Sequence, residues 1–231
     1  MTSLPDGYRA VVVGGSGGIG AAMVQFLRDD PRCAQVEALH RSADIAVDFA
    51  DERSIADAAS TLATGGACHL IVNAAGVLHT ADFMPEKRLA DLNVAQMLET
   101  FRVNTFGPAL LLRHFTPLLA AERSVMAFVS AKVGSIGDNR LGGWYSYRAS
   151  KAALNMLVKT AAIELARTRS GAIVVALHPG TVDTPLSRPF RGAEIGRPAG
   201  TAAAEMLKVL DGLQPDDSGC FVAWDGTRLP W

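Results

Sequence analysis

The chain has 231 residues, of which 49% are hydrophobic, 19% charged and 6% aromatic, and its formal net charge is −1. Because the chain has no surplus of basic residues, it lacks the driving force for general binding to nucleic-acid phosphates. No apolar run approaches the roughly 18 residues that a membrane span needs. The first residues show no basic region followed by an apolar one, so we expect no secretory signal. Three dispersed cysteines predict neither a disulfide framework nor a zinc cluster and favour the cytoplasm.

Short apolar runs alternate with segments of helical periodicity along the chain. Strands are expected at 8–13, 35–39, 45–48, 69–72, 125–129, 173–177 and 220–224. Helices are expected at 18–28, 52–62, 94–120 with an interruption near Gly107-Pro108, 145–168 and 201–213. This alternation predicts one α/β domain over residues 1–231, a doubly wound Rossmann-type fold with about seven parallel strands and helices on both faces.

A glycine-rich turn follows the first predicted strand and opens the first predicted helix. The run from Gly14 to Gly20 reads GGSGGIG. It fits a G-x-G-x-x-G spacing from Gly15 and a wider G-x-x-x-G-x-G spacing from Gly14, and the motif does not choose between them. Glycines let the backbone approach a pyrophosphate, and the helix N-terminus presents free N–H groups to it, so we expect a dinucleotide site.

The residues after the second predicted strand bear on the choice of dinucleotide. An NAD site usually carries an acidic residue about 20 positions after the turn, to hold the ribose hydroxyls. Here the strand ends in Leu39-His40-Arg41, and Glu37 lies earlier, inside the strand. A guanidinium suits a 2′-phosphate, which favours NADP(H), while NAD(H) stays open if Arg41 is an ordinary surface arginine.

Tyr147 and Lys151 are four positions apart in a predicted helix and therefore share one face. A phenol has a reference pKa of about 10, and a nearby ammonium lowers this pKa. Tyr147 would then give a proton to a carbonyl oxygen as hydride arrives, or take one in reverse. The Y-x-x-x-K spacing alone is common in helices and gains specificity from the glycine turn upstream. Tyr145 has Ala149 at the lysine position and lacks such a partner.

Several further segments complete a family pattern: NAAG at 73–76, PGTVDT at 179–184, Asp48, and Asn104 within FRVN. Together with the glycine turn and the tyrosine–lysine pair, they resemble the short-chain dehydrogenase/reductase family over nearly the whole chain. The resemblance implies that Asp48 lies beside the adenine, that 179–184 touches the nicotinamide amide, and that Asn104 supports the lysine through water. Segments 142–148 and 224–231 look most similar to C-factor and sniffer-like carbonyl reductases.

The same resemblance implies a set of residues that contact the cofactor. They are Gly14, Ser16, Gly17, Gly18, Ile19, Gly20, Arg41, Asp48, Phe49, Asn73, Ala74, Ala75, Gly76, Tyr147, Lys151, Pro179, Gly180, Val182 and Thr184. The five histidines show no metal spacing, so no metal is expected.

One departure from the family pattern concerns the serine that would polarise the substrate carbonyl. The family usually carries S-S-x-x-G after the fifth strand, and alignment on Gly134 puts Ala131 at the customary serine. Counting back twelve positions from Tyr147 favours Ser135 instead, and Ser130 is the second choice. The remaining alternative is that no serine fills this role.

The expected activity is hydride transfer between NADP(H) and a small-molecule carbonyl or alcohol, in a homodimer or homotetramer as the resemblance implies. The stretch 186–200, rich in Arg, Pro and Gly, is expected to form a lid over the substrate. The main alternative is a cofactor-binding signalling or sensor module with little turnover. A nucleotide-sugar epimerase is a third alternative, but it normally needs a longer segment after Thr184.

Overall fold

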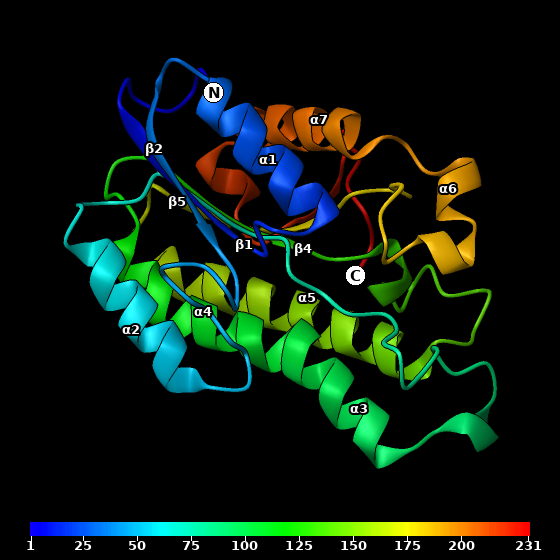
Figure 1. Cartoon of the computed structure of the whole chain (residues 1–231). Helices are drawn as coiled ribbons and strands as arrows, with labels where there is room; N and C mark the ends of the chain where they lie inside the picture. Colours follow the sequence, from blue (N-terminus) through cyan, green and yellow to red (C-terminus); the bar gives the residue numbers. More distant parts are fainter.

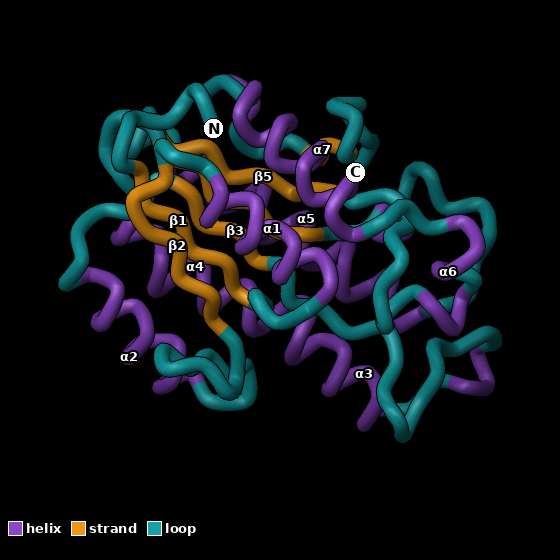
Figure 2. The backbone as a smooth tube through the Cα atoms, turned by 45° about the horizontal axis from the view of Figure 1, so that its top comes forward, coloured by secondary structure: helices purple, strands orange, loops and turns teal.

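The computed structural model describes residues 1–231 and contains six parallel strands in one sheet, ordered β2-β1-β3-β4-β5-β6. The strands are β1 Tyr8–Val13, β2 Cys33–Leu39, β3 Leu70–Asn73, β4 Ser124–Val129, β5 Ala172–His178 and β6 Phe221–Ala223. The tube in Figure 2 shows them as the central layer, with helices around it. The predicted doubly wound Rossmann-type fold is confirmed, with one strand fewer than expected.

The helices are α1 Gly18–Asp29, α2 Glu52–Ala63, α3 Val94–Phe101, α4 Gly107–Phe115, α5 Tyr145–Leu165, α6 Gly192–Ile195 and α7 Ala199–Gly212. Helices α1 and α7 cover one face of the sheet, and α2, α4 and α5 cover the other (Figure 1). Within β1, Val11 and Val12 enter opposite core clusters because successive side chains of a strand point to opposite faces. Burial on both faces explains why the strands read as apolar runs.

The expected strand at 45–48 is wrong. Ala46 makes only an isolated bridge with His40, and no strand forms there. The carboxylate of Asp48 accepts a hydrogen bond from the Ala50 N–H at 2.9 Å, and Ser54 Oγ donates to Asp48 O at 3.1 Å. These local side-chain bonds favour a turn before α2 over an extended ladder.

The helix expected at 94–120 is interrupted earlier than predicted and ends at Phe115. A π-helical turn, Arg102–Phe106, joins α3 to α4, so the irregularity lies before Gly107 and Pro108. Pro108 itself lies at the start of α4, just after this turn, and has no backbone N–H to donate to it.

None of the helices combines the length and the apolar character needed to cross a bilayer.

The strand order places the functional edge of the sheet. The chain winds from β1 outward to β2, and then returns to β3 on the other side of β1. The carboxyl ends of β1 and β3 therefore diverge at a topological switch point, the usual ligand crevice of open α/β sheets.

Candidate active site

A cavity of about 570 Å³ lies at the carboxyl edge of the sheet. Its wall comes from the turn after β1, the segments after β3, β4 and β5, and the start of α5. The lining residues that this description uses are Gly17, Gly18, Ile19, Ala74, Ala75, Gly76, Ser130, Ala131, Lys132, Trp144, Tyr147, Lys151, His178, Pro179, Gly180, Val182, Thr184, Leu186, Phe190 and Ile195. The structure thus brings most of the predicted cofactor and catalytic residues to one cavity.

The glycine turn is packed so closely that a side chain at Gly14 or Gly20 would clash with neighbouring backbone atoms. Gly14 has φ +79°, and a Cβ there would lie 2.6 Å from Ala75 N. A Cβ on Gly20 would lie 2.2 Å from the Gly14 carbonyl oxygen. Helix α1 begins with no side-chain cap and no acidic residue in its first turn, which leaves the N–H groups and positive end of the helix for an anion. The residues present therefore fit the diphosphate of a dinucleotide.

The segments after β3 and β5 meet the glycine turn. A Cβ on Gly18 would lie 2.7 Å from Thr184 Cγ2, so these two segments pack directly on each other. Asn73 Oδ1 accepts a hydrogen bond from Ala75 N at 3.2 Å. The other amide atom, Asn73 Nδ2, is buried without a partner in the protein. An unpaired buried donor beside the cavity is a further feature that a bound ligand would satisfy.

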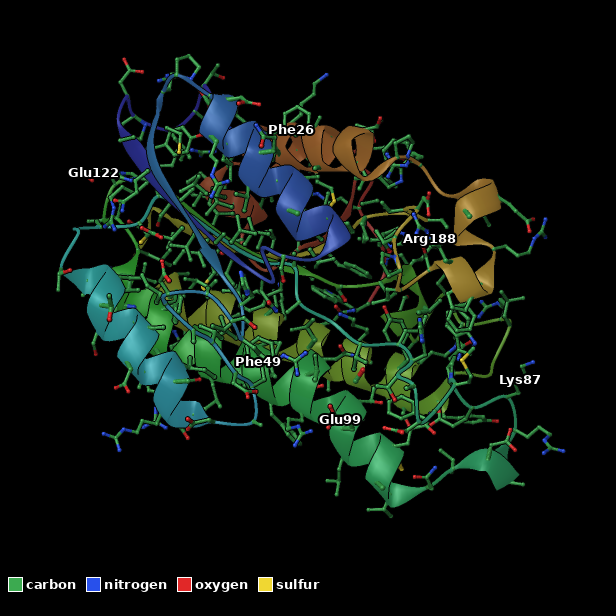
Figure 3. All side chains as sticks on the ribbon, in the orientation of Figure 1. Phe26, Phe49, Lys87, Glu99, Glu122 and Arg188 are labelled. Carbon is green, nitrogen blue, oxygen red and sulfur yellow. The ribbon has the colours of Figure 1, made fainter.

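Seven residues predicted to contact the cofactor lie outside the cavity lining: Gly14, Ser16, Gly20, Arg41, Asp48, Phe49 and Asn73. Arg41 is exposed and forms no ion pair with a protein carboxylate. Asp48 is engaged in the turn before α2. The ring of Phe49 lies against the start of α4, where a Cβ on Gly107 would come within 2.2 Å of it (Figure 3).

Tyr147 and Lys151 lie in the first turns of α5 and are both buried, at 8% and 3% exposure. Lys151 Nζ donates to the Val129 carbonyl oxygen at 2.9 Å and lies 5.8 Å from the Tyr147 ring centroid. Burial lowers the pKa of Lys151 to about 8 and raises the pKa of Tyr147 above its ordinary value. The predicted lowering of the Tyr147 pKa by Lys151 is therefore not found, because desolvation of the phenol dominates.

Asn104 is fully buried in the π-helical turn Arg102–Phe106. Its Oδ1 accepts from Val77 N at 2.8 Å, and its Nδ2 donates to Val77 O at 2.8 Å and to Ser150 Oγ at 3.1 Å. Asn104 does not bond Lys151 directly, but a Cβ on Gly76 would lie 3.4 Å from Asn104 Oδ1 and 3.5 Å from Lys151 Nζ. The two side chains thus converge on the same point of the cavity wall.

The two candidate serines differ in position. Ser130 lines the cavity, and its hydroxyl donates to Asn155 Oδ1 at 2.7 Å. Ser135, the first choice from the sequence, is buried outside the lining and donates to the Trp231 carbonyl oxygen at 3.2 Å. Spacing along the chain misplaced it, because residues 132–134 form a 3₁₀ turn that carries the next residue away. Ala131 lines the cavity at the customary serine position.

An aromatic pair that sequence reasoning did not single out lies above Tyr147. The Trp144 ring centroid is 6.2 Å from that of Tyr147 and 5.0 Å from that of Phe190, both in edge-to-face geometry. Trp144 has φ +52°, an unusual value for a bulky residue. The only sequence signal was the position of Trp144 between Gly142-Gly143 and the tyrosines.

His178 also lines the cavity, at the end of β5. Its Nδ1 accepts a hydrogen bond from the Lys132 N–H at 3.2 Å. Burial, and then the charges of Lys132 and Arg197, lower the pKa of His178 to about 4. The imidazole is therefore neutral near pH 7, and its proton resides on Nε2.

Two relatives cover much of the chain. The 1-hydroxy-2-glutathionyl-2-methyl-3-butene dehydrogenase of Rhodococcus sp. (strain AD45) is 34% identical over 230 residues, which cover 96% of this chain and 98% of that protein. The C-signal protein of Myxococcus xanthus is 40% identical over 145 residues, which cover 62% of this chain and 83% of that protein.

Solved structures agree with these relatives. The NADPH-bound carbonyl reductase from chicken fatty liver is 28% identical, with a TM-score of 0.83 over 99% of this chain and 100% of that one. The carbonyl reductase Sniffer of D. melanogaster, at 22% identity, shares the fold with a TM-score of 0.85 over 99% and 100% of the two chains. The predicted resemblance to C-factor and sniffer-like proteins is confirmed. The model of the short chain dehydrogenase family matches residues 8–194, and the chain belongs to this family.

Proposed function

We propose that the protein is an NADP(H)-dependent oxidoreductase that transfers a hydride between the nicotinamide and a small-molecule carbonyl or alcohol. The observation that carries this proposal is that buried Tyr147 and Lys151 line the same cavity as the glycine turn at the start of α1. The NADPH in the chicken carbonyl reductase structure and the dehydrogenase name of the Rhodococcus relative support it.

NADP(H) is the favoured cofactor. Arg41 follows β2, has no competing carboxylate partner, and is exposed for contact with a 2′-phosphate. The backbone from Gly14 to Gly20 would hold the diphosphate, and Pro179, Gly180 and Val182 would line the nicotinamide end of the cavity. When bound, the cofactor supplies or accepts the hydride.

Tyr147 is the proposed general acid/base. Because burial raises its pKa, the phenol keeps its proton near neutral pH and is suited to donate it to a carbonyl oxygen. Lys151, with a pKa of about 8, is mostly protonated near pH 7 and would place an ammonium beside the phenol and the cofactor ribose. Asn104 would fix this arrangement through Val77 and Ser150.

Ser130 is the serine that we assign to the substrate oxygen, because it lines the cavity and Ser135 does not. Trp144 and Phe190 supply apolar surface around this point. We further propose that residues 186–200 act as the lid, since Leu186, Phe190 and Ile195 belong to the cavity wall. The wall contains no acidic side chain, and its apolar character suits a small carbonyl compound.

Tyr147→Phe tests the proposal. Removing the phenolic proton should lower kcat for NADPH-dependent carbonyl reduction by about 10²–10⁴-fold. The affinity for NADPH should stay within about two-fold, as measured by titration of NADPH fluorescence, because the ring and the glycine turn remain. Tyr145→Phe, two positions away and without a lysine partner, is the control and should keep its activity.

Wild-type turnover in Tyr147→Phe would disprove the assigned role. If the wild-type protein binds NADPH but turns over none of a broad panel of aldehydes and ketones, the signalling or sensor alternative is favoured instead.

A further inference from the structure

The start of α5 is held by a carboxylate from a distant part of the chain. Glu86 lies 60 positions before Ser146, on the segment between β3 and α3, and is 2% exposed. Its Oε2 accepts from the Ser146 backbone N–H at 3.2 Å, and its Oε1 accepts from the Ser146 hydroxyl. The Glu86 carbonyl oxygen accepts from the Trp144 N–H at 2.5 Å. Three hydrogen bonds therefore join one residue to the first turn of the helix that carries Tyr147.

Helix α5 lacks the features that usually stabilise such a start. Its N-cap position is Trp144, which provides no side-chain cap, and the first turn contains no acidic residue. Gly142, Gly143 and Trp144 have φ +64°, +65° and +52°, so the chain enters the helix through three left-handed residues. The free N–H groups at the start of a helix need hydrogen-bond acceptors. A negative charge at this position is also stabilised by the positive end of the helix dipole. Glu86 supplies both from outside the helix.

Glu86 is itself held in place. Gln96 Nε2 donates to the Met84 carbonyl oxygen at 3.0 Å, which ties the segment to α3. The N–H groups of Lys87 and Arg88 donate to Asp91 Oδ2 at 3.2 and 3.0 Å. No basic side chain forms an ion pair with Glu86. A buried carboxylate without a cation depends on its hydrogen bonds, so its contacts with α5 are the interactions that offset its burial.

We propose that Glu86 is a positioning residue for Tyr147 and Trp144, acting as a cap on α5 supplied by a separate segment. This inference rests on the proposed role of Tyr147 as general acid/base. The cap fixes Ser146, the residue before Tyr147, and Trp144, whose ring contacts Tyr147 and Phe190. A small displacement of the phenol would lower kcat, although every group that contacts the cofactor or the substrate would still be present.

The experiment compares Glu86→Ala, Glu86→Gln and a control, Asp82→Ala, an exposed carboxylate on the same segment. Glutamine can still accept from the Ser146 N–H and donate to the Ser146 hydroxyl oxygen, so it should restore the cap. We expect Glu86→Ala to lower kcat by about 10- to 100-fold with the KM for NADPH within about two-fold. The kcat of Glu86→Gln should stay within about three-fold of the wild-type kcat, and the kcat of Asp82→Ala should equal the wild-type value.

A second readout needs no turnover. Amide hydrogen exchange should speed up at residues 144–148 in Glu86→Ala, while the middle of α5, around Val158, keeps its protection. Glu86→Gln should exchange like wild type. Ser146→Ala removes only the hydrogen bond from the Ser146 hydroxyl to Glu86, so its amide exchange rate at residues 144–148 should increase less. This variant still tests the cap if the Glu86→Ala protein does not fold.

The two proposals fail in different ways. Absence of carbonyl turnover in the wild-type protein contradicts the proposed function, and the exchange data then still test the cap. The cap is disproved if folded Glu86→Ala keeps the wild-type kcat and exchange at residues 144–148. It is also disproved if Glu86→Gln is as impaired as Glu86→Ala, because a hydrogen-bonding cap predicts rescue by the amide.

Discussion

Lys151 has an ammonium group that the protein core disfavours. Its side chain is 3% exposed, and burial lowers its pKa to about 8. We expect Lys151→Met to abolish turnover and yet to raise the free energy of unfolding at pH 7 by about 1–3 kcal/mol, since one pKa unit corresponds to about 1.4 kcal/mol. The loss of the bond to the Val129 carbonyl oxygen offsets part of this gain. Urea unfolding of the two proteins measures the difference.

The pH dependence of this difference has a definite sign. A lysine with a lowered pKa in the folded state releases its proton before the unfolded chain does, so wild-type stability rises between about pH 8 and the ordinary value of 10.5. The advantage of Lys151→Met should therefore shrink across this range. Lys159→Met, at an exposed position of the same helix, is the control and should show no such trend. A Lys151→Met protein that is less stable than wild type at pH 7 would contradict the argument.

Residues that depend on local spacing were predictable from the sequence, and residues that depend on distant contacts were not. The glycine turn, Tyr147 and Lys151 follow from a strand–turn–helix pattern and a four-residue interval. Ser135 was misplaced because its bond to the Trp231 carbonyl oxygen joins segments 96 positions apart. Glu86 gave no local signal at all, since its partners lie on α5. The pKa of Tyr147 likewise reflects burial, which sequence spacing does not reveal.

At the scale of elements, the last turn of α7 anchors the N-terminal segment. Asp211 accepts hydrogen bonds from the N–H and hydroxyl groups of both Thr2 and Ser3, at 2.6–2.9 Å. Burial alone would raise the pKa of Asp211, but these bonds outweigh it and lower the pKa to about 2. Asp211→Ala should reduce the free energy of unfolding by about 1 kcal/mol near pH 7, a modest value because the carboxylate is partly exposed and screened.

Acid unfolding tests this anchor. A carboxyl with a lowered folded-state pKa stabilises the protein above its unfolded value of about 3.8, and this stability is lost as the pH falls toward 2. The difference between wild type and Asp211→Ala should therefore be constant above about pH 5 and vanish near pH 2. Asp216→Ala, at an exposed position nearby, is the control and should follow the wild-type curve. A difference that persists unchanged at pH 2 would rule out the ionised carboxylate as its source.

The strands and the long helix α5 were predicted well from their apolar patterns. All six strands and the long helix α5 lie within a few residues of their expected bounds, with β2 extended to Cys33. The segment 45–48 was wrongly expected as a strand because its apolar residues do not reveal the turn-forming bonds of Asp48 and Ser54. The π-helical turn at Asn104 has no sequence signal comparable to Pro108, so the interruption was expected a few residues too late.

At the scale of the whole molecule, one face leaves large apolar side chains in solvent. They are Leu98 on α3, Phe106 in the π-helical turn, and Met156 and Ile163 on α5, with exposures of 58%, 49%, 67% and 49%. Met156 and Ile163 are seven positions apart and share one face of their helix. Figure 1 shows α3, α4 and α5 side by side on the same side of the sheet. Exposed apolar surface of this kind is typical of a protein–protein interface.

This face provides a test of the expected homodimer or homotetramer. Wild-type protein should sediment as a dimer or tetramer, and the double variant Met156→Glu with Ile163→Glu should sediment as a monomer, because two buried carboxylates per protomer oppose association. Phe26→Glu is the control, since Phe26 is 43% exposed on α1, across the sheet from this face (Figure 3). A monomeric wild type, or an oligomer that survives both glutamates, would show that this face does not mediate assembly.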